Sequence, residues 1–431
     1  MLKHLKLANV GPSSAMELEF GERLNLITGD NGLWKSFLLD IAWWSMTRKW
    51  PAQINPDLPA GLMAKPLGSG PASIEFTFTA KSKTFSYVST FDRKVQGWTG
   101  KAGRPANPGL VLYAQADGSF AVWDPAHNYW RQSGKIDVQD RPPAYVFSPR
   151  EVWDGLRDDE RGLVCNGLIV DWAGWQKENG HAFKSLCAVL QELSPSAEET
   201  ITPGELTRIS LDDPRDIPTI RMPYGQSVPV LHASAGIRRI LALAYLLVWS
   251  WEEHKTASKL LDQETTSQVV FLIDEIEAHL HPKWQRRIVS ALLGVMNTLT
   301  SNAEVQIITA THSPLVMASV EPSFDASKDA WFDLDLVVDG HQHAEVELKN
   351  RSFIRRGDVS NWLTSEAFDL SSARSLEAEK ILHDAAIALS DEDFDREKAQ
   401  VLDAQLRTVL GDTDRFWMRW RFVAEKKGWL S

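Results

Sequence analysis

Several features that define other classes of protein are scarce in this sequence. Two cysteines, Cys165 and Cys187, are too few for a disulfide framework. The apolar run from Leu241 to Trp251 is shorter than the roughly 18 to 20 apolar residues that a membrane span needs. The first residues have neither the apolar core of a signal peptide nor the bias of a transit peptide. We therefore expect a cytoplasmic protein without a membrane role.

Positive charge and heptad repeats are also scarce. A formal net charge of −11 excludes a surface that is basic throughout, so contact with nucleic acid would need a local patch. The lack of a heptad pattern over three or more repeats excludes a long coiled-coil arm. The 18 tryptophans are spread over expected helices and strands, which favours packing over base stacking. A chain of 431 residues, 43% of them apolar, predicts two or three compact units.

Strand and helix patterns alternate along the chain and predict an α/β fold in four segments. Residues 1–150 contain a glycine-rich loop and alternating strands, and predict an antiparallel β subdomain made from SIEFTFTA, KTFSYVSTF, GLVLYAQ and SFAVWD. Residues 151–203 predict an inserted helical lobe. A second mixed lobe is expected over residues 204–350 and a helical C-terminal region over residues 351–431.

The stretch GDNGLWKS, Gly29 to Ser36, is close to the phosphate-loop pattern G-x-x-x-x-G-K-[ST]. A predicted strand precedes it and a predicted buried helix follows it. Gly29 and Gly32 would let backbone N–H groups converge on phosphate oxygens. Lys35 would reach the β- and γ-phosphates, and Ser36 would bind Mg²⁺. The alternative is a tight strand-to-helix turn without a ligand. The other loop residues are Asp30, Asn31, Leu33 and Trp34.

Two adjacent acids, Asp274 and Glu275, end the apolar run VVFLI, which predicts a fully buried strand. Burying acids at a strand tip is costly unless a cation compensates. Asp274 would therefore hold the magnesium, and Glu275 would orient and deprotonate the attacking water. The alternative is a surface acid pair at a strand end, which the phosphate loop upstream disfavours.

Two further motifs are interpreted together with the phosphate loop and the acid pair. The run QIITATHSP predicts another buried strand, and His312 at its tip would stand beside the acids if the two strands are parallel neighbours. It could then donate a hydrogen bond to a γ-phosphate oxygen. Ser234 precedes a long apolar helix with Gly236 in its first turn. Taken alone, His312 would be a strand-end cap and Ser234 a helix N-cap.

The order of phosphate loop, serine–glycine helix start, Asp-Glu strand and strand-tip histidine resembles the ABC-type ATPase heads. Three motifs narrow this resemblance: the Asn-Gly of the loop, DEIEAHLHP and THSPLV. They resemble the branch that holds RecF, the SMC heads and the overcoming-lysogenization-defect ATPases. Within that branch, the sequence is most similar to small stand-alone AAA-type members in bacterial defence operons. The resemblance implies a P-loop NTPase of ABC-ATPase type, with a mixed central sheet plus an antiparallel β subdomain. It also implies ATP and Mg²⁺ as cofactors.

The resemblance further implies a head-to-tail homodimer with two ATP molecules at the interface. One subunit would supply the phosphate loop, the Walker B acids and the histidine switch, and the other would supply Ser234 and Gly236. The signature motif reads Ser-Ala-Gly here, where the family has Ser-Gly-Gly. The glutamine loop of transporter ATPases is not recognisable, although SPREVW, Ser148 to Trp153, takes roughly its place in the order.

Trp34 stands where the pattern has glycine, the residue that lets the backbone approach the phosphates closely. A side chain there intrudes on that space or imposes an unfavourable φ. Three accounts stay open: a binding-deficient relative kept as a scaffold, a loop that tolerates Trp34 by turning its ring outward, or a recent single-base change. We favour a working ancestor with a recent or tolerated change, because Lys35 or Glu275 would have drifted in a long-decayed enzyme. ATP hydrolysis by this chain stays an open question.

The residues after Arg356 lack the Asp-x-Asp constellation of a TOPRIM nuclease, so the effector is expected on another polypeptide. We expect an ATP-dependent regulator or sensor subunit of a bacterial defence system, paired with a separately encoded effector such as a nuclease. A second hypothesis is a RecF-like DNA-binding ATPase, and a third is a nucleotide-free scaffold. The second would use as phosphate contacts Arg238, Arg239, Lys283, Arg286 and Arg287.

Overall fold

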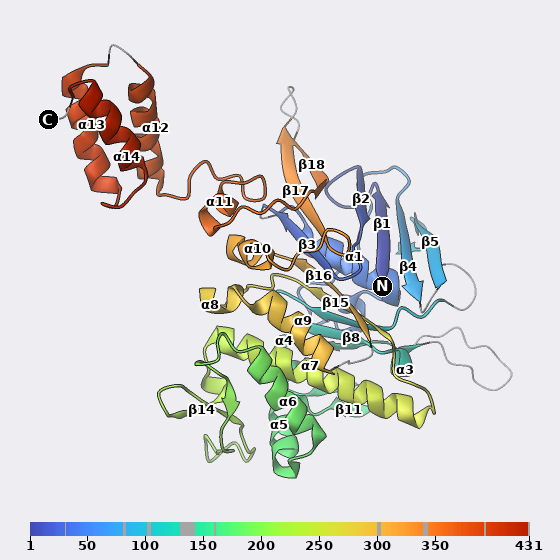
Figure 1. Cartoon of the computed structure of the whole chain (residues 1–431). Helices are drawn as coiled ribbons and strands as arrows, with labels where there is room; N and C mark the ends of the chain where they lie inside the picture. Colours follow the sequence, from blue (N-terminus) through green and yellow to red (C-terminus); the bar gives the residue numbers. More distant parts are fainter. Residues whose placement is uncertain are drawn as a thin grey trace. The chain divides into compact units, whose positions relative to one another are not determined.

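A computed structural model describes residues 1–30, 32–80, 83–100, 105–129, 143–158, 161–299, 303–338, 344–391 and 394–429 (Figure 1). The chain forms two compact units, Met1–Gly357 and Asp358–Ser431. Each unit has its own apolar core. No helix of the described residues is long and apolar enough to cross a membrane.

An eight-stranded mixed sheet forms the centre of the first unit, in the order β18-β17-β3-β16-β15-β7-β8-β9. The five strands from β17 to β7 are parallel, and β18, β8 and β9 are antiparallel to their neighbours. Strands β3, β15 and β7 are buried along their whole length, as expected for parallel strands covered on both faces. The bounds are β3 Leu24–Gly29, β7 Leu110–Ala114, β8 Phe120–Trp123, β9 Tyr145–Phe147, β15 Gln268–Ile273, β16 Glu304–Ala310, β17 Ala330–Val338 and β18 Ala344–Arg351.

A second, antiparallel sheet has the order β2-β1-β4-β5-β6. Helix α1 (Lys35–Thr47) contacts β1 of this sheet as well as β16 and β7 of the central sheet. Both sheets and α1 share one core, in which Trp44 stacks on Trp50 and packs against Phe76. This core fixes the start of α1, and with it the phosphate loop. The strand bounds are β1 Leu2–Ala8, β2 Ala15–Glu19, β4 Ser73–Ala80, β5 Lys83–Asp92 and β6 Gly97–Trp98.

Helices α7 (Ala235–Leu260) and α9 (Ile288–Leu299) lie on the side of the central sheet away from α1 (Figure 1). Helix α6 (His181–Glu192) packs against both, and α5 (Gly167–Glu178) packs against α6 and α7. Shorter elements complete this unit: α2 Pro51–Ile54, α3 Pro125–Asn128, α4 Pro149–Asp154, β10 Leu156–Asp158, β11 Gly162–Cys165, β12 Thr202–Pro203, β13 Thr219–Arg221, β14 Ser227–Pro229, η1 Val230–His232, α8 Pro282–Gln285 and α10 Pro314–Val320.

The expected placement of two strands was wrong. GLVLYAQ and SFAVWD form β7 and β8 of the central sheet, where β7 pairs in parallel with β15, and do not join the antiparallel sheet. Every residue of β7 and β8 is buried, whereas a half-buried strand such as β4 alternates between buried and partly exposed residues. The expected helical segment 151–203 also contains the hairpin β10–β11 between α4 and α5.

The second unit consists of helices around a tryptophan-rich core. Trp417, Trp420 and Trp429 are buried there, and the Trp420 indole N–H donates to Asp403 over 2.9 Å. Leu402 and Leu406 of α13 complete the apolar contacts. The bounds are α11 Val359–Leu363, α12 Leu376–Ser390, α13 Arg396–Val409 and α14 Phe416–Lys426.

Candidate nucleotide site

The phosphate-loop sequence lies between β3 and α1. Gly29 ends β3 with a φ of 134°, and a Cβ there would stand 2.4 Å from the Leu334 carbonyl oxygen, so only glycine fits. Gly32 has a φ of 83° and open space around it. Asn31 lies outside the described residues. The loop thus has the strand–turn–helix context that a phosphate loop needs.

Lys35 is the first residue of α1, and its side chain turns back into the loop. Its ammonium donates to the carbonyl oxygens of Gly29 and Asp30, over 2.8 Å each. Burial lowers the pKa of Lys35 to about 8, while the nearby Asp274 and Asp30 oppose that shift. Among the described residues, the hydrogen-bond acceptors of this buried ammonium are two neutral carbonyl groups, so it is suited to an anionic partner.

Trp34 adopts the left-handed backbone conformation, with φ 69° and ψ 32°. Its side chain is 52% exposed and packs edge-on against Phe37, with ring centroids 5.4 Å apart. Left-handed backbone costs a residue with a side chain roughly 1–2 kcal/mol, which is why glycine suits this position. The penalty is therefore conformational, because the ring turns outward onto its neighbour.

Asp274 directly follows β15, beside the phosphate loop. Its backbone N–H donates to the Ala114 carbonyl over 2.8 Å. Burial raises the pKa of Asp274 to about 6. The neighbouring Ser36 hydroxyl, Arg239 and Lys35 act in the opposite direction and lower it. The Oδ1 atom is buried and has no hydrogen-bond partner among the described residues. Because buried polar atoms normally have a partner, this oxygen is suited to contact a ligand. A divalent cation is the ligand that a carboxylate beside a phosphate loop would take.

The parallel pairing of β15 and β16 brings the second acid and the histidine together, as the motif order suggested. Burial and Lys35 lower the pKa of the half-buried His312, while Glu275 and Asp30 raise it. These three charged groups therefore lie close enough to His312 to affect its protonation. Glu275 leaves the strand with a φ of 46°. Lysine, both acids and histidine therefore surround one space at the carboxyl ends of three parallel strands.

Glu277 was not singled out from the sequence, yet it holds the histidine loop. Its half-buried carboxylate accepts from the His312 backbone N–H over 2.5 Å and from the Thr311 hydroxyl over 2.7 Å. Burial raises the pKa of Glu277, and these two hydrogen bonds lower it. Its signal in the sequence was the third acid of DEIE, two residues beyond Glu275.

Gln115 is a second residue missed at the sequence level. It directly follows β7, the strand beside Asp274, and is 2% exposed. The Tyr113 hydroxyl lies near, but neither amide atom of Gln115 forms a hydrogen bond of acceptable geometry among the described residues. Gln115 therefore lies, with both side-chain amide atoms unpaired among the described residues, at the end of the strand that neighbours Asp274. The Ser148–Trp153 stretch forms α4, begun by a Ser148–Glu151 capping box.

Arg239, on the second turn of α7, contacts the acid-bearing loop of the site. Its guanidinium donates to the carbonyl oxygens of Ala116, Asp274 and Glu275 over 2.8, 3.0 and 3.1 Å. Burial lowers the pKa of Arg239, while the nearby acids Asp274, Glu275, Glu277 and Asp117 raise it. The side chain joins α7, the β7–β8 turn and the tip of β15.

Ser234 caps α7, and its hydroxyl accepts from the Ile237 backbone N–H over 3.4 Å. The Ser234 side chain is exposed. Gly236 packs so closely on the loop after β15 that a Cβ would stand 2.5 Å from the His279 carbonyl oxygen. The expected signature residues thus lie on the surface, beside the acid-bearing loop of their own chain.

A family model described as "AAA domain, putative AbiEii toxin, Type IV TA system" matches residues 24–318, which include every residue of this site. The chain belongs to this AAA domain family. The AAA-type ATPase family expected from the motifs is therefore confirmed, as is an α/β fold with a mixed central sheet. Membership implies nucleotide binding. The second unit and the first 23 residues lie outside the matched part.

Two curated relatives of this AAA domain protein are retron proteins. "Retron Ec83 probable ATPase" of Escherichia coli is 26% identical over 208 residues, 47% of this chain and 33% of the relative. "Retron Vc95 probable ATPase" of Vibrio cholerae is 33% identical over 96 residues, 22% of this chain and 17% of the relative. The matched part thus spans a third or less of either relative's length.

Among solved structures, an SMC head domain from Thermotoga maritima matches the AAA domain protein at a TM-score of 0.39 and 13% identity. The match covers 81% of this chain and 99% of the other. An SMC head bound to the C-winged helix domain of ScpA matches at 0.40 and 14% identity, covering 81% and 97%.

Most of the cations suggested for DNA contact have partners within the AAA domain protein. Arg239 binds the carbonyls described above, Lys283 pairs with Glu199, and Arg287 lies 3.9 Å from Glu192. Arg238 and Arg286 are exposed. The described residues therefore leave few free cations near the site for a DNA backbone.

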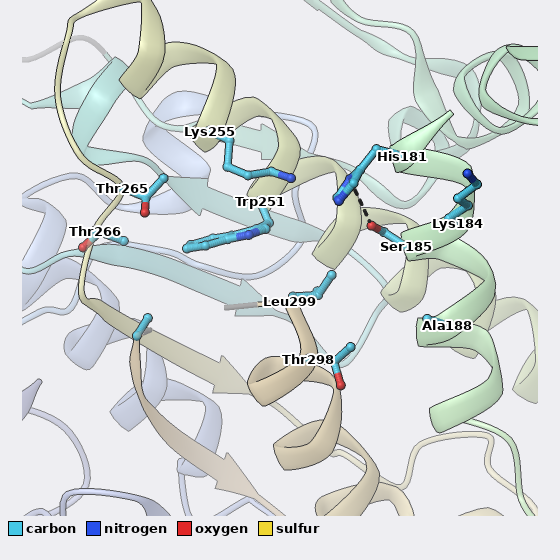
Figure 2. Close-up of a pocket in the computed structure, with 11 residues that line it drawn as sticks. His181, Lys184, Ser185, Ala188, Trp251, Lys255, Thr265, Thr266, Thr298 and Leu299 are labelled. Atoms are coloured by element: carbon cyan, nitrogen blue, oxygen red, sulfur yellow. Dashed lines mark hydrogen bonds between the residues drawn. The ribbon is translucent and has the colours of Figure 1, made fainter. Parts of the chain in front are cut away.

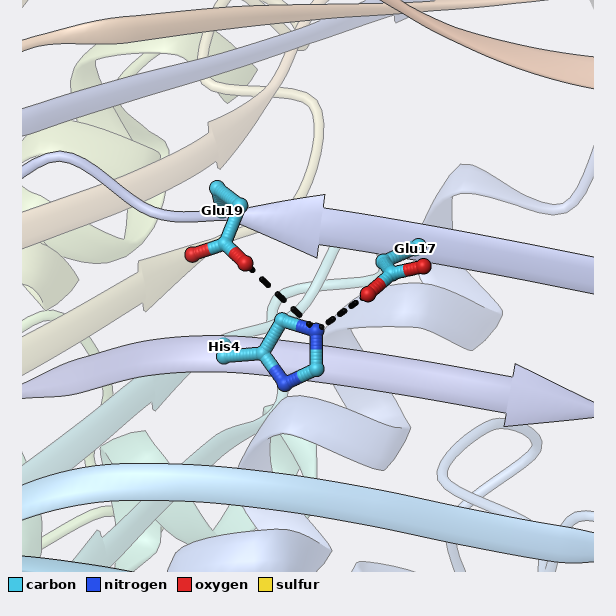
Figure 3. A group of neighbouring side chains, drawn as sticks. All are labelled: His4, Glu17 and Glu19. Atoms are coloured by element: carbon cyan, nitrogen blue, oxygen red, sulfur yellow. Dashed lines mark hydrogen bonds and ion pairs between the residues drawn. The ribbon is translucent and has the colours of Figure 1, made fainter.

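A separate His–Glu–Glu group lies on the antiparallel sheet (Figure 3). His4 Nε2 is 2.8 Å from Glu17 and 3.6 Å from Glu19, and Lys6 lies 3.3 Å from Glu17. His4 and Glu19 are direct cross-strand partners. Because opposite charges across an exposed antiparallel pair account for this arrangement, it needs no metal.

Proposed function

We propose that this chain is an ATP-hydrolysing regulator that acts as a homodimer and controls a separately encoded effector in a bacterial defence system. One observation carries the ATPase part of the proposal. Asp274 keeps a buried, unpartnered carboxylate oxygen beside a phosphate loop whose lysine is held by neutral carbonyls. Both groups suit the two halves of a magnesium–nucleotide complex.

The residues present fit ATP and Mg²⁺. The Lys35 ammonium would exchange its bonds to Gly29 and Asp30 for phosphate oxygens, and Ser36, Asp274 and Gln115 would hold the magnesium. When bound, Mg²⁺ neutralises charge on the β- and γ-phosphates. Glu275 would orient water and accept its proton. Because the pKa of His312 is lowered, its ring is neutral at neutral pH and would donate one N–H to a phosphate oxygen.

A second subunit would complete the site. Ser234 is exposed at the N-terminus of a long helix, where a backbone N–H group and a hydroxyl suit a phosphate. We therefore expect Ser234 and Gly236 of one subunit to cover the nucleotide of the other. Size measurement of the Glu275→Gln variant should show a dimer with Mg-ATP, and Ser234→Arg should keep it monomeric. Dimers that ignore both nucleotide and Ser234→Arg would contradict this arrangement.

The defence context of the proposal is supported by the retron relatives, whose names record probable ATPases. The separate effector is proposed because the residues after Arg356 lack the Asp-x-Asp constellation of a TOPRIM nuclease. The effector is expected to be a nuclease encoded beside this chain. Co-expression should give a complex that survives gel filtration and whose nuclease activity changes with the Glu275→Gln substitution. A chain that never associates with the neighbouring gene product would argue against this part.

The first test is calorimetric titration of Mg-ATP into Glu275→Gln, which stops hydrolysis from distorting the isotherm. The same titration into Glu275→Gln with Trp34→Gly measures what Trp34 costs, and Glu275→Gln with Lys35→Ala is the control. We expect binding in the first two and none in the third. Binding only after Trp34→Gly would instead favour the scaffold account.

The RecF-like alternative predicts salt-sensitive DNA binding. The internal pairing of Arg239, Lys283 and Arg287 disfavours it. A duplex that binds at low salt and is released by Arg238→Glu with Arg286→Glu would revive it.

A further inference from the structure

A second cavity lies where α6, α7 and α9 come together, and nothing in the ATPase mechanism uses it (Figure 2). Its volume is about 530 Å³, within the usual range of small-molecule sites. Thr265 and Thr266, which line it, precede the first residue of β15, whereas Asp274 follows the last. The cavity therefore lies at the opposite end of the strand from the acids, roughly 20 Å away at the rise of an extended chain.

Basic side chains from two helices line this cavity. His181 and Lys184 stand at the start of α6, and Lys255 stands on α7. Glu252 joins two of them, lying 3.0 Å from His181 and 2.8 Å from Lys255. In Figure 2 the Lys255 ammonium and the His181 ring extend toward one another above the Trp251 ring. Lys184 is exposed and pairs with no carboxylate among the described residues. Glu252 offsets the charge of Lys255, so Lys184 is the group through which the cavity can offer positive charge to an anion.

An aromatic wall and hydroxyl groups accompany this charge. Trp251 is 8% exposed, and the surface it keeps lines the cavity. Thr265, Thr266 and Thr298 also line the cavity, and the hydroxyls of Thr266 and Thr298 donate to the carbonyl oxygens of Gln268 and Gly294. Flat aromatic surface favours a planar base, lysines favour a phosphate, and threonine hydroxyls can bond to a sugar or base edge. An inorganic anion alone would use neither the indole nor most of the volume.

We infer that this cavity binds a nucleoside monophosphate unit, with the base on Trp251 and the phosphate on Lys184, Lys255 and His181. That unit has two sources with the same chemistry, a free mononucleotide and the 5′-phosphorylated end of a DNA strand. The site is separate from the phosphate loop and shares no residue with it.

The test is calorimetric titration of AMP, and separately of a 5′-phosphorylated DNA oligonucleotide, into the full chain carrying Lys35→Ala. This substitution disables the phosphate loop, so any remaining binding belongs elsewhere. We expect one of the two probes to bind with one site per chain. Lys184→Glu, added to Lys35→Ala, should weaken that binding about tenfold or more, because it replaces an exposed cation by an anion. Lys259→Glu is the matched control, an exposed lysine of α7 that does not line the cavity.

The two probes separate the sources. Binding of AMP alone assigns a free nucleotide, and binding of the oligonucleotide only with its 5′-phosphate assigns a strand end. Trp251→Phe keeps an aromatic ring and should bind, whereas Trp251→Leu should lose affinity. If Trp251→Leu does not fold, Lys184→Glu decides alone. The inference is overturned if neither probe binds, if Lys184→Glu and Lys259→Glu bind equally well, or if inorganic phosphate binds as tightly as AMP.

Discussion

At the scale of single residues, the departure from the loop pattern concerns the backbone more than the side chain. Trp34 takes a φ of 69° and places its ring against Phe37. Replacement by glycine should relieve the left-handed backbone, and replacement by alanine should not. We expect Trp34→Gly to be more stable than Trp34→Ala by about 1 kcal/mol. Urea unfolding of the two variants measures this, and both lose the same ring contact. Equal stability would mean that the loop does not select for glycine.

Asp274 allows a prediction about pH. Its pKa is raised from 3.8 to about 6, so the folded chain binds a proton that the unfolded chain releases. Asp274 therefore lowers the free energy of unfolding progressively as the pH rises from 4 to 6. Above pH 6 this loss levels off at about 3 kcal/mol. Without ligand, Asp274→Asn should be more stable than the natural chain, with a gap that widens over that range. Thermal unfolding at pH 4.5 and 7.5 measures the gap. A gap of the same size at both values would show that burial does not perturb this carboxyl.

The sequence identifies residues whose chemistry is local and misses those placed by long-range pairing. Lys35, Asp274 and His312 each follow an apolar run in an ordered motif, and all three lie at one edge of the sheet. Gln115 had no such motif, because its role depends on β7 pairing with β15 more than 150 positions later. The same pairing explains why GLVLYAQ, expected in the antiparallel sheet, lies in the central sheet instead.

At the scale of elements, Arg239 joins α7 to the β7–β8 turn and the acid-bearing tip of β15. Arg239→Met should leave several buried carbonyl groups without donors and lower the free energy of unfolding by about 2–4 kcal/mol. Its neighbour Arg238 is exposed, so Arg238→Met should change stability by less than about 0.5 kcal/mol. Urea unfolding compares the two, and mutants of equal stability would remove Arg239 from its anchoring role.

At the scale of the whole molecule, the chain divides into two compact units after Gly357. The expected segments 1–150, 151–203 and 204–350 all fall within Met1–Gly357, because β3 and β7 from the first and β15 to β18 from the last share one sheet. Sheet order cannot be read from a single sequence, since it depends on which distant strands pair. The C-terminal helices, in contrast, are specified by their local periodicity.

The second unit should therefore fold alone. Residues 358–431 contain a core that includes Trp417, Trp420, Trp429 and Leu406, and the family match ends before them. A fragment of residues 358–431 should be helical by circular dichroism and unfold cooperatively in urea. Trp420→Ala should abolish that transition, because it removes a fully buried side chain and leaves the Asp403 carboxylate without its indole donor. Phe422→Ala, at a 70% exposed position of the same helix, should leave the transition nearly unchanged. A fragment without cooperative unfolding would mean that this core depends on the rest of the chain.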